Sequence, residues 1–84
     1  MEISLIEMKP GETGVVKRLL GGHGFVNRLE ALGIRLYKKI TKVSSMLMRG
    51  PIIVNVNNIT IAVGHGMAKR IIVEIDDENP TYGR

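Results

Sequence analysis

The glycine-rich stretch at residues 21–24, Gly-Gly-His-Gly, is the first place in the chain where bound phosphate could be expected. A glycine-rich turn before a helix favours an anion, because free backbone N–H groups and the helix dipole both point at it. A P-loop needs a lysine and a hydroxyl residue directly after the glycines, whereas here Gly24 is followed by Phe25, Val26 and Asn27. The glycine spacing also differs from a dinucleotide-binding fingerprint. We therefore predict that these glycines turn a strand into a helix.

Two histidines are the only other candidates for metal chemistry. His23 and His65 each stand alone in a glycine-rich turn, and the chain has no cysteine. Transition-metal sites of the softer kind need cysteine and histidine ligands at close spacing. The sequence predicts no confident metal or cofactor site, and His23 and His65 are weak candidates for a loosely bound divalent transition metal, ferrous iron or zinc.

Catalytic patterns are missing from the sequence. No serine or cysteine nucleophile stands beside a base, and no pair of carboxylates lies within an apolar segment. At 84 residues the chain also has little room for an enclosed active-site cavity. We predict that the protein is not an enzyme and has no catalytic residues.

Charge is unevenly distributed along the chain. Residues 74–84 hold four of the eight acidic residues but one of the twelve basic residues, so the body is basic and the tail is acidic. We expect one domain over residues 1–75 and an acidic, disordered tail over residues 76–84. No leader sequence or long apolar run is present, which predicts a soluble, cytoplasmic protein.

The first half of the chain predicts a turn, a strand and a helix. Pro10 and Gly11 are the corner residues of a turn over residues 8–12, and residues 15–20 are rich in strand-forming aliphatics. From Phe25 onward, apolar residues recur at helical spacing for two to three turns. Gly33 is predicted to end this helix, and Ile34 to fold back on it in a Schellman cap.

The second half predicts a hairpin between two further strands. A two-residue turn at Asn57 and Asn58 would pair residues 52–56 with residues 59–63 and place their six large aliphatics on one face. Residues 39–47 form a preceding strand in which Ile40 and Val43 break strict alternation, which indicates a β-bulge. Residues 70–75 form a following strand. The fold prediction is all-β: a small, partly open barrel of about five strands with one short helix inserted after the first barrel strand.

An ordered set of short motifs runs along the chain from about Ser4 to Glu74. The motifs are Lys9-Pro10-Gly11-Glu12 with Gly14, Arg28-Leu29 followed by Leu32-Gly33-Ile34, Gly50-Pro51, and Ile61-Ala62 followed by Ala68 and Ile71. As an ordered set they resemble one known family, the ferrous-iron transport protein A or FeoA-like proteins.

The resemblance implies an SH3-like barrel and a cytoplasmic accessory role in ferrous-iron uptake. It implies a partner, a membrane ferrous-iron transporter with a cytosolic GTPase domain, which would recruit the chain to the inner face of the membrane and which the chain would modulate. Three positions depart from the family pattern: Tyr37 and Asn58 stand where glycine is common, and His65 stands where arginine is common. A positive φ at Tyr37 would be costly, which leaves the entry to the second strand open.

The expected mechanism is contact with this partner. Arg28, Met46 and Met48 are the candidate partner-binding residues, and exposed sheet edges also predict a homo-oligomer. The alternative is a basic SH3-like nucleic-acid-binding or metal-responsive regulatory module, with a basic face formed by Lys17, Arg18, Arg28, Arg35, Lys38, Lys39, Lys42 and Arg49. Nucleic acid is disfavoured because three aromatic residues, one of them assigned to the core, do not make a stacking platform.

Overall fold

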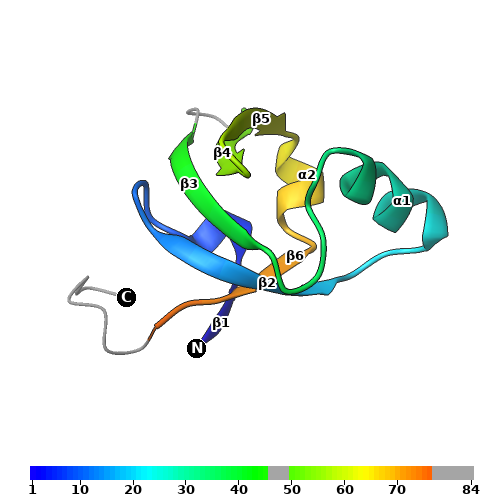
Figure 1. Ribbon diagram of the computed structural model, residues 1–84, viewed down its shortest axis with the longest axis horizontal. Helices are drawn as coiled ribbons and strands as arrows, with labels where there is room; N and C mark the ends of the chain where they lie inside the picture. Colours follow the sequence, from blue (N-terminus) through cyan, green and yellow to red (C-terminus); the bar gives the residue numbers. More distant parts are fainter. Residues whose placement is uncertain (46–49, 77–84) are drawn as a thin grey trace.

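A computed structural model describes residues 1–45 and 50–76 of the chain (Figure 1). Within these residues, six antiparallel strands form one sheet in the order β1-β6-β2-β3-β4-β5. No helix in the described part of the chain is long and apolar enough to cross a membrane. The elements in chain order are β1 (Glu2–Ser4), the 3₁₀ helix η1 (Leu5–Glu7), β2 (Thr13–Leu19), α1 (His23–Ala31), β3 (Lys39–Ser45), β4 (Ile52–Val56), β5 (Ile59–Val63), α2 (His65–Ala68) and β6 (Ile71–Glu74).

The mainly β architecture agrees with the prediction, with α1 inserted directly after the first predicted strand, β2. The sequence did not predict three short elements: β1, η1 and α2. Each has three or four residues, which is too few to show a hydrophobic period. They form only because partners from elsewhere in the chain pair with or cover them, as β6 does for β1.

The β4–β5 hairpin confirms the predicted register. Val54 pairs with Ile61, and the pairs on either side continue the same register. Asn57 and Asn58 have φ values of 53° and 64°, as a type I′ turn requires. Four of the six inward aliphatics are buried, but Ile59 is 60% exposed because it lies beside the turn, past the end of the core.

Strand β3 contains the predicted bulge. Its pairing with β4 shifts register between Lys42 and Ser44, which leaves Val43 as the extra, exposed residue. The strand was expected over residues 39–47 and is observed over Lys39–Ser45; residues 46 and 47 lie outside the described residues.

Lys42 lies in the interior, which corrects its assignment to a basic face. Its side chain is fully buried, and its Nζ donates hydrogen bonds to the carbonyl oxygens of Leu5 (3.2 Å), Ile6 (2.8 Å) and Met8 (2.6 Å). Burial lowers the pKa of the Lys42 ammonium below its ordinary value, while the negative charge of Glu12 opposes this shift. The ammonium therefore joins β3 to η1 and the residue that follows it.

The predicted turn at Pro10 and Gly11 brings Glu12 to this ammonium. Gly11 has φ +91°, and the Glu12 N–H donates to the Lys9 carbonyl at 3.0 Å. The Glu12 side chain is buried and accepts a 2.7 Å hydrogen bond from the Lys9 N–H. Backbone bonds in both directions between residues 11–12 and Lys42 complete the attachment, at 2.7 and 2.9 Å.

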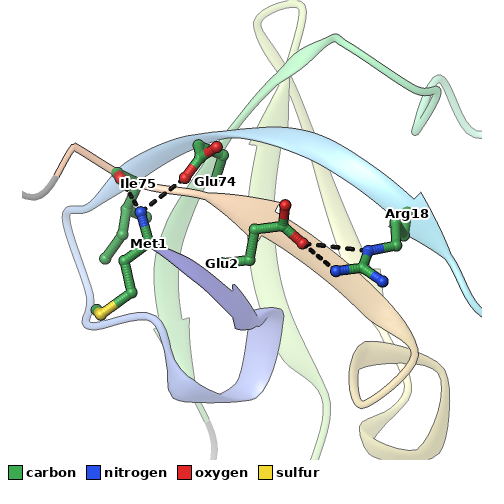
Figure 2. Close-up of polar contacts among 5 residues, drawn as sticks. All are labelled: Met1, Glu2, Arg18, Glu74 and Ile75. Carbon is green, nitrogen blue, oxygen red and sulfur yellow. Dashed lines mark hydrogen bonds and ion pairs between the residues drawn. The ribbon is translucent and has the colours of Figure 1, made fainter.

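Two ion pairs lie at the β1 edge of the sheet (Figure 2). The Met1 amine contacts the Glu74 carboxylate at 2.6 Å, and the Arg18 guanidinium contacts Glu2 at 2.5 Å. The neighbouring arginine lowers the pKa of Glu2, chiefly through their hydrogen bond. All four residues are partly exposed, so solvent screens their charges. The two ion pairs therefore contribute little to stability.

We predict that Lys42→Met lowers the free energy of unfolding by about 3 to 5 kcal/mol. Methionine fills similar space but leaves the Glu12 carboxylate without its positive neighbour and three carbonyls without their donor. The measurement is urea denaturation, with Lys39→Met on the exposed start of the same strand as the control, expected within about 0.5 kcal/mol of wild type. Adding Glu12→Gln should recover part of the loss, and an unchanged Lys42→Met midpoint would contradict the assignment.

Candidate partner-binding surface

Helix α1 ends in the predicted Schellman cap. Gly33 has φ +92° and its N–H donates to the Glu30 carbonyl at 3.0 Å, while the Ile34 N–H donates to the Leu29 carbonyl at 2.9 Å. Leu29 and Ile34 are both fully buried and belong to the hydrophobic core. The cap therefore fixes the C-terminal end of the helix against the barrel.

The rest of α1 is held to the barrel by few side chains. Leu29 is its one fully buried residue, and Phe25 packs partly against the core with the Arg70 guanidinium 5.3 Å from its ring centroid. Figure 1 shows α1 at one end of the longest axis of the molecule. Most of the helix surface consequently faces away from the barrel.

We call residues 20–38, which connect β2 to β3 and contain α1, the α1 insertion. It exposes four large apolar side chains: Leu20 (50% exposed), Leu32 (41%), Leu36 (42%) and Tyr37 (71%). Scattered exposed apolar residues are ordinary, but several on one protruding insertion are typical of an interaction surface. The insertion is the strongest candidate for a protein contact in the described part of the chain.

The structure describes one of the three predicted partner-binding residues. Arg28 lies on the last turn of α1 and is exposed, on the same insertion as the apolar side chains. Met46 and Met48 lie outside the described residues. The partner assignment of all three stays a prediction.

The two candidate metal ligands lie on different helices. His23 is the exposed first residue of α1, and His65 is the half-buried first residue of α2. Among residues 1–45 and 50–76, no group of three or more histidine, cysteine, aspartate or glutamate side chains is placed to hold a metal ion. A site built on either histidine would need ligands from a second molecule or from outside these ranges.

The expected basic face is smaller than predicted. Lys42 is buried, Arg18 pairs with Glu2, and Arg49 lies outside the described residues. Lys17 is half-buried, with its Nζ 5.7 Å from the Tyr37 ring centroid. The exposed cations that remain of this predicted set are Arg28, Arg35, Lys38 and Lys39.

Tyr37 takes the positive φ that glycine would tolerate more easily. Its φ is 68°, in a turn closed by a 3.2 Å hydrogen bond from the Lys38 N–H to the Arg35 carbonyl. Backbone bonds join this turn to β2, from Tyr37 N–H to the Val16 carbonyl at 2.7 Å and from Val16 N–H to the Lys38 carbonyl at 2.9 Å. The chain therefore enters β3 although Tyr37 stands where the family pattern has glycine, and the positive φ of Tyr37 strains the backbone locally.

A shallow groove lies between β2, the start of β3 and the end of β6. Its lining residues are Thr13, Gly14, Val15, Lys39, Glu74, Ile75 and Asp76. A Cβ at Gly14 would lie 2.9 Å from the Glu74 carbonyl oxygen, so β2 and β6 approach too closely there for any other residue. The groove is open to solvent, and its charged residues have mixed signs, which gives it no evident ligand.

Sequence reasoning missed two features of the structure, one on this surface and one in the interior. The exposure of Leu20 and Leu36 was not predicted, although the run Arg35-Leu36-Tyr37-Lys38-Lys39 carries a signal, since apolar residues between bases in a turn have no core to enter. The buried Lys42 and Glu12 gave no signal at all, because charged residues are usually exposed.

Comparison with known proteins gives a consistent result. The family model described as "FeoA domain" matches residues 3–75. A protein of Methanocaldococcus jannaschii named "Putative Fe(2+) transport protein A" is 35% identical over 66 residues, covering 79% of this chain and 78% of that protein.

Solved structures agree with the fold. The crystal structure of an "Iron Uptake Regulatory Protein (FeoA)" matches with a TM-score of 0.80 and 38% identity, over 88% of this chain and 96% of that one. A "Manganese-dependent transcriptional repressor" matches with a TM-score of 0.81 but 23% identity, over 88% of this chain and 41% of the repressor, and this shows a shared fold only. The predicted SH3-like barrel is confirmed.

We predict that Tyr37→Gly raises the free energy of unfolding by up to about 1 kcal/mol, because glycine adopts positive φ without strain and Tyr37 buries little surface. Thermal unfolding followed by circular dichroism would show a higher Tm. The β-branched Tyr37→Val is the matched variant and should lower the Tm. A lower Tm for Tyr37→Gly would mean that the contact between Lys17 and the ring outweighs the backbone strain.

We predict that dialysed protein binds ferrous iron or zinc weakly or not at all, because neither His23 nor His65 has further ligands placed around it in the described ranges. Isothermal titration calorimetry under anaerobic conditions measures this, with His23→Ala and His65→Ala as the variants. Stoichiometric binding at micromolar affinity that either substitution abolishes would overturn this prediction.

Proposed function

The chain belongs to the FeoA family, and from this membership we propose that it is an accessory protein of ferrous-iron uptake that binds and modulates a membrane ferrous-iron transporter. The observation that carries the proposal is the family match over residues 3–75. This range includes all six strands of the sheet, except for Glu2 at the start of β1. The Methanocaldococcus jannaschii relative, whose name refers to Fe(2+) transport, supports the same role.

The proposed mechanism is contact with the cytosolic GTPase domain of the transporter. A bound protein shifts a conformational equilibrium of its partner only by its different affinity for the two states. The chain therefore needs a preformed surface that fits one state better than the other. The proposed role requires no catalytic step by this chain.

The α1 insertion is the proposed contact surface. Protein interfaces draw most of their energy from a few arginine, aromatic or large apolar anchors that become desolvated. Arg28 and Leu32 supply such groups on the last turn of α1 and its C-cap, and both are exposed. Because the Schellman cap holds this end of the helix to the buried Leu29, the two side chains are presented from a fixed backbone.

Binding of the full chain to the transporter's GTPase domain tests the proposal. We expect measurable affinity at physiological salt in at least one nucleotide state, and a loss of about fivefold or more with Arg28→Ala or with Leu32→Ala. Lys69→Ala is the matched control, because Lys69 is exposed at the end of α2, outside the α1 insertion. Met46→Ala with Met48→Ala tests the remaining predicted residues.

The same measurement distinguishes the alternative role. Phosphate contacts lose affinity steeply as salt rises, whereas an interface of desolvated anchors does not. If the GTPase domain shows no contact in any nucleotide state while DNA or RNA oligonucleotides bind at physiological salt, the accessory role is wrong and the chain is a nucleic-acid-binding module.

A further inference from the structure

The turn that leads into β3 has an unusual composition for an exposed turn. It comprises Arg35, Leu36, Tyr37 and Lys38, and we call these four residues the basic turn. The Lys38 N–H donates to the Arg35 carbonyl at 3.2 Å and closes it, and its two corner residues are Leu36 and Tyr37. Two apolar side chains thus occupy the tip, between a guanidinium and an ammonium.

The tip side chains project into solvent. Tyr37 is 71% exposed and Leu36 is 42% exposed, while Arg35 and Lys38 are also exposed. The Lys17 ammonium lies 5.7 Å from the centroid of the Tyr37 ring and adds a third cation beside the tip. Two hydrogen bonds to Val16 hold the backbone of the turn against β2, so the tip is displayed from a fixed support.

The positive φ of Tyr37 is held by backbone hydrogen bonds to Val16 and not by packing of its ring. The residue has φ 68°, a conformation that costs an ordinary L-residue free energy and that glycine would adopt freely. The ring is not buried in the core. Strain that packing does not offset is often found at functional positions, and here it holds an aromatic ring outside the barrel.

The segment of chain around the basic turn is mostly basic. Between Thr13 and Lys39 the chain carries six basic residues and one acidic residue, Glu30. Within residues 1–45 and 50–76, neither Arg35 nor Lys38 makes an ion pair. Lys39 lines the groove that also contains Glu74 and Asp76, so the cations that lie in or beside the tip are Arg35, Lys38 and Lys17.

We propose that the basic turn is a contact site for a membrane surface of anionic phospholipids. Lysine and arginine side chains are attracted to such a surface, tyrosine favours the headgroup region, and leucine enters the acyl boundary. The turn presents these three kinds of side chain together.

The small size of the basic turn fits a lipid surface better than a protein or a nucleic acid. A stable protein interface buries about 800 Å² on each side, which the four residues of the basic turn do not offer without the rest of the α1 insertion. Single-stranded nucleic acid needs successive aromatic rings for stacking, and Tyr37 is the one exposed aromatic side chain in the described residues. This inference goes beyond the proposed function, since the contact requires no transporter.

Vesicle binding by the full chain tests the proposal. The probes are vesicles of phosphatidylcholine alone and of phosphatidylcholine with phosphatidylglycerol at a ratio of about 7 to 3, in sedimentation assays at low and physiological salt. We expect at least about tenfold tighter binding to the anionic vesicles at low salt, weakened by added salt.

Three variants localise the contact. Arg35→Gln with Lys38→Gln removes two cations and should weaken binding about tenfold, and Leu36→Ser should weaken it at constant charge. Tyr37→Gly removes the ring while relieving the strained φ, so weaker binding by this variant could not be attributed to unfolding. Lys69→Gln is the control, because it removes an exposed charge at the end of α2, away from the basic turn. Its affinity for the vesicles should fall by no more than the loss of one charge explains.

Two outcomes would overturn the proposal. The first is equal binding to neutral and anionic vesicles, or none to either. The second is anionic binding that all three basic-turn variants leave unchanged. If a single-stranded oligonucleotide binds at physiological salt and Tyr37→Gly abolishes that binding while vesicles do not bind, the site recognises nucleic acid and the lipid assignment is wrong.

Discussion

The buried ammonium of Lys42 is the contact on which the rest of this small barrel depends. An isolated charge in a protein interior is costly, and it is tolerated only where hydrogen bonds and an opposite charge replace water. Here three carbonyl oxygens from residues 5–8 accept hydrogen bonds from Nζ, and the buried Glu12 supplies the negative charge. These groups come from segments with too few residues to form stable structure on their own. The ammonium thereby orders η1 and the turn after it, and places β1 where it can pair with β6.

This arrangement leaves the opposite end of the fold less constrained. The α1 insertion is attached mainly through Leu29, Ile34 and the partly buried Phe25. Most of its other side chains are exposed, so they are available for contact without loss of the core. A stable barrel with a lightly attached, outward-facing insertion suits an accessory protein that acts by binding.

The two proposed contacts lie on the same insertion but use different side chains. Arg28 and Leu32 lie at the end of α1, while Leu36 and Tyr37 lie at the tip of the basic turn, a few residues further along the chain. A lipid contact by the turn would hold α1 near a membrane surface, where a membrane transporter presents its cytosolic domain.

The sequence by itself determined the elements whose signals are local. The turn at Pro10 and Gly11, the cap at Gly33 and the hairpin register around Asn57 and Asn58 all follow from which residues tolerate positive φ and from periods of 2 and 3.6. The ordered motifs also indicated the family that the match over residues 3–75 then showed.

Only the tertiary structure decided which charged side chains are buried and how the short elements β1, η1 and α2 form. Lys42 and Glu12 resemble surface residues in the sequence, and their burial depends on carbonyls more than thirty residues from Lys42 in the chain. The positive φ of Tyr37 is likewise imposed from outside, by hydrogen bonds to Val16 on the neighbouring strand. Local propensity reports the preference of a residue among its neighbours in sequence, whereas burial and strain are set by distant atoms that the folded chain brings into contact.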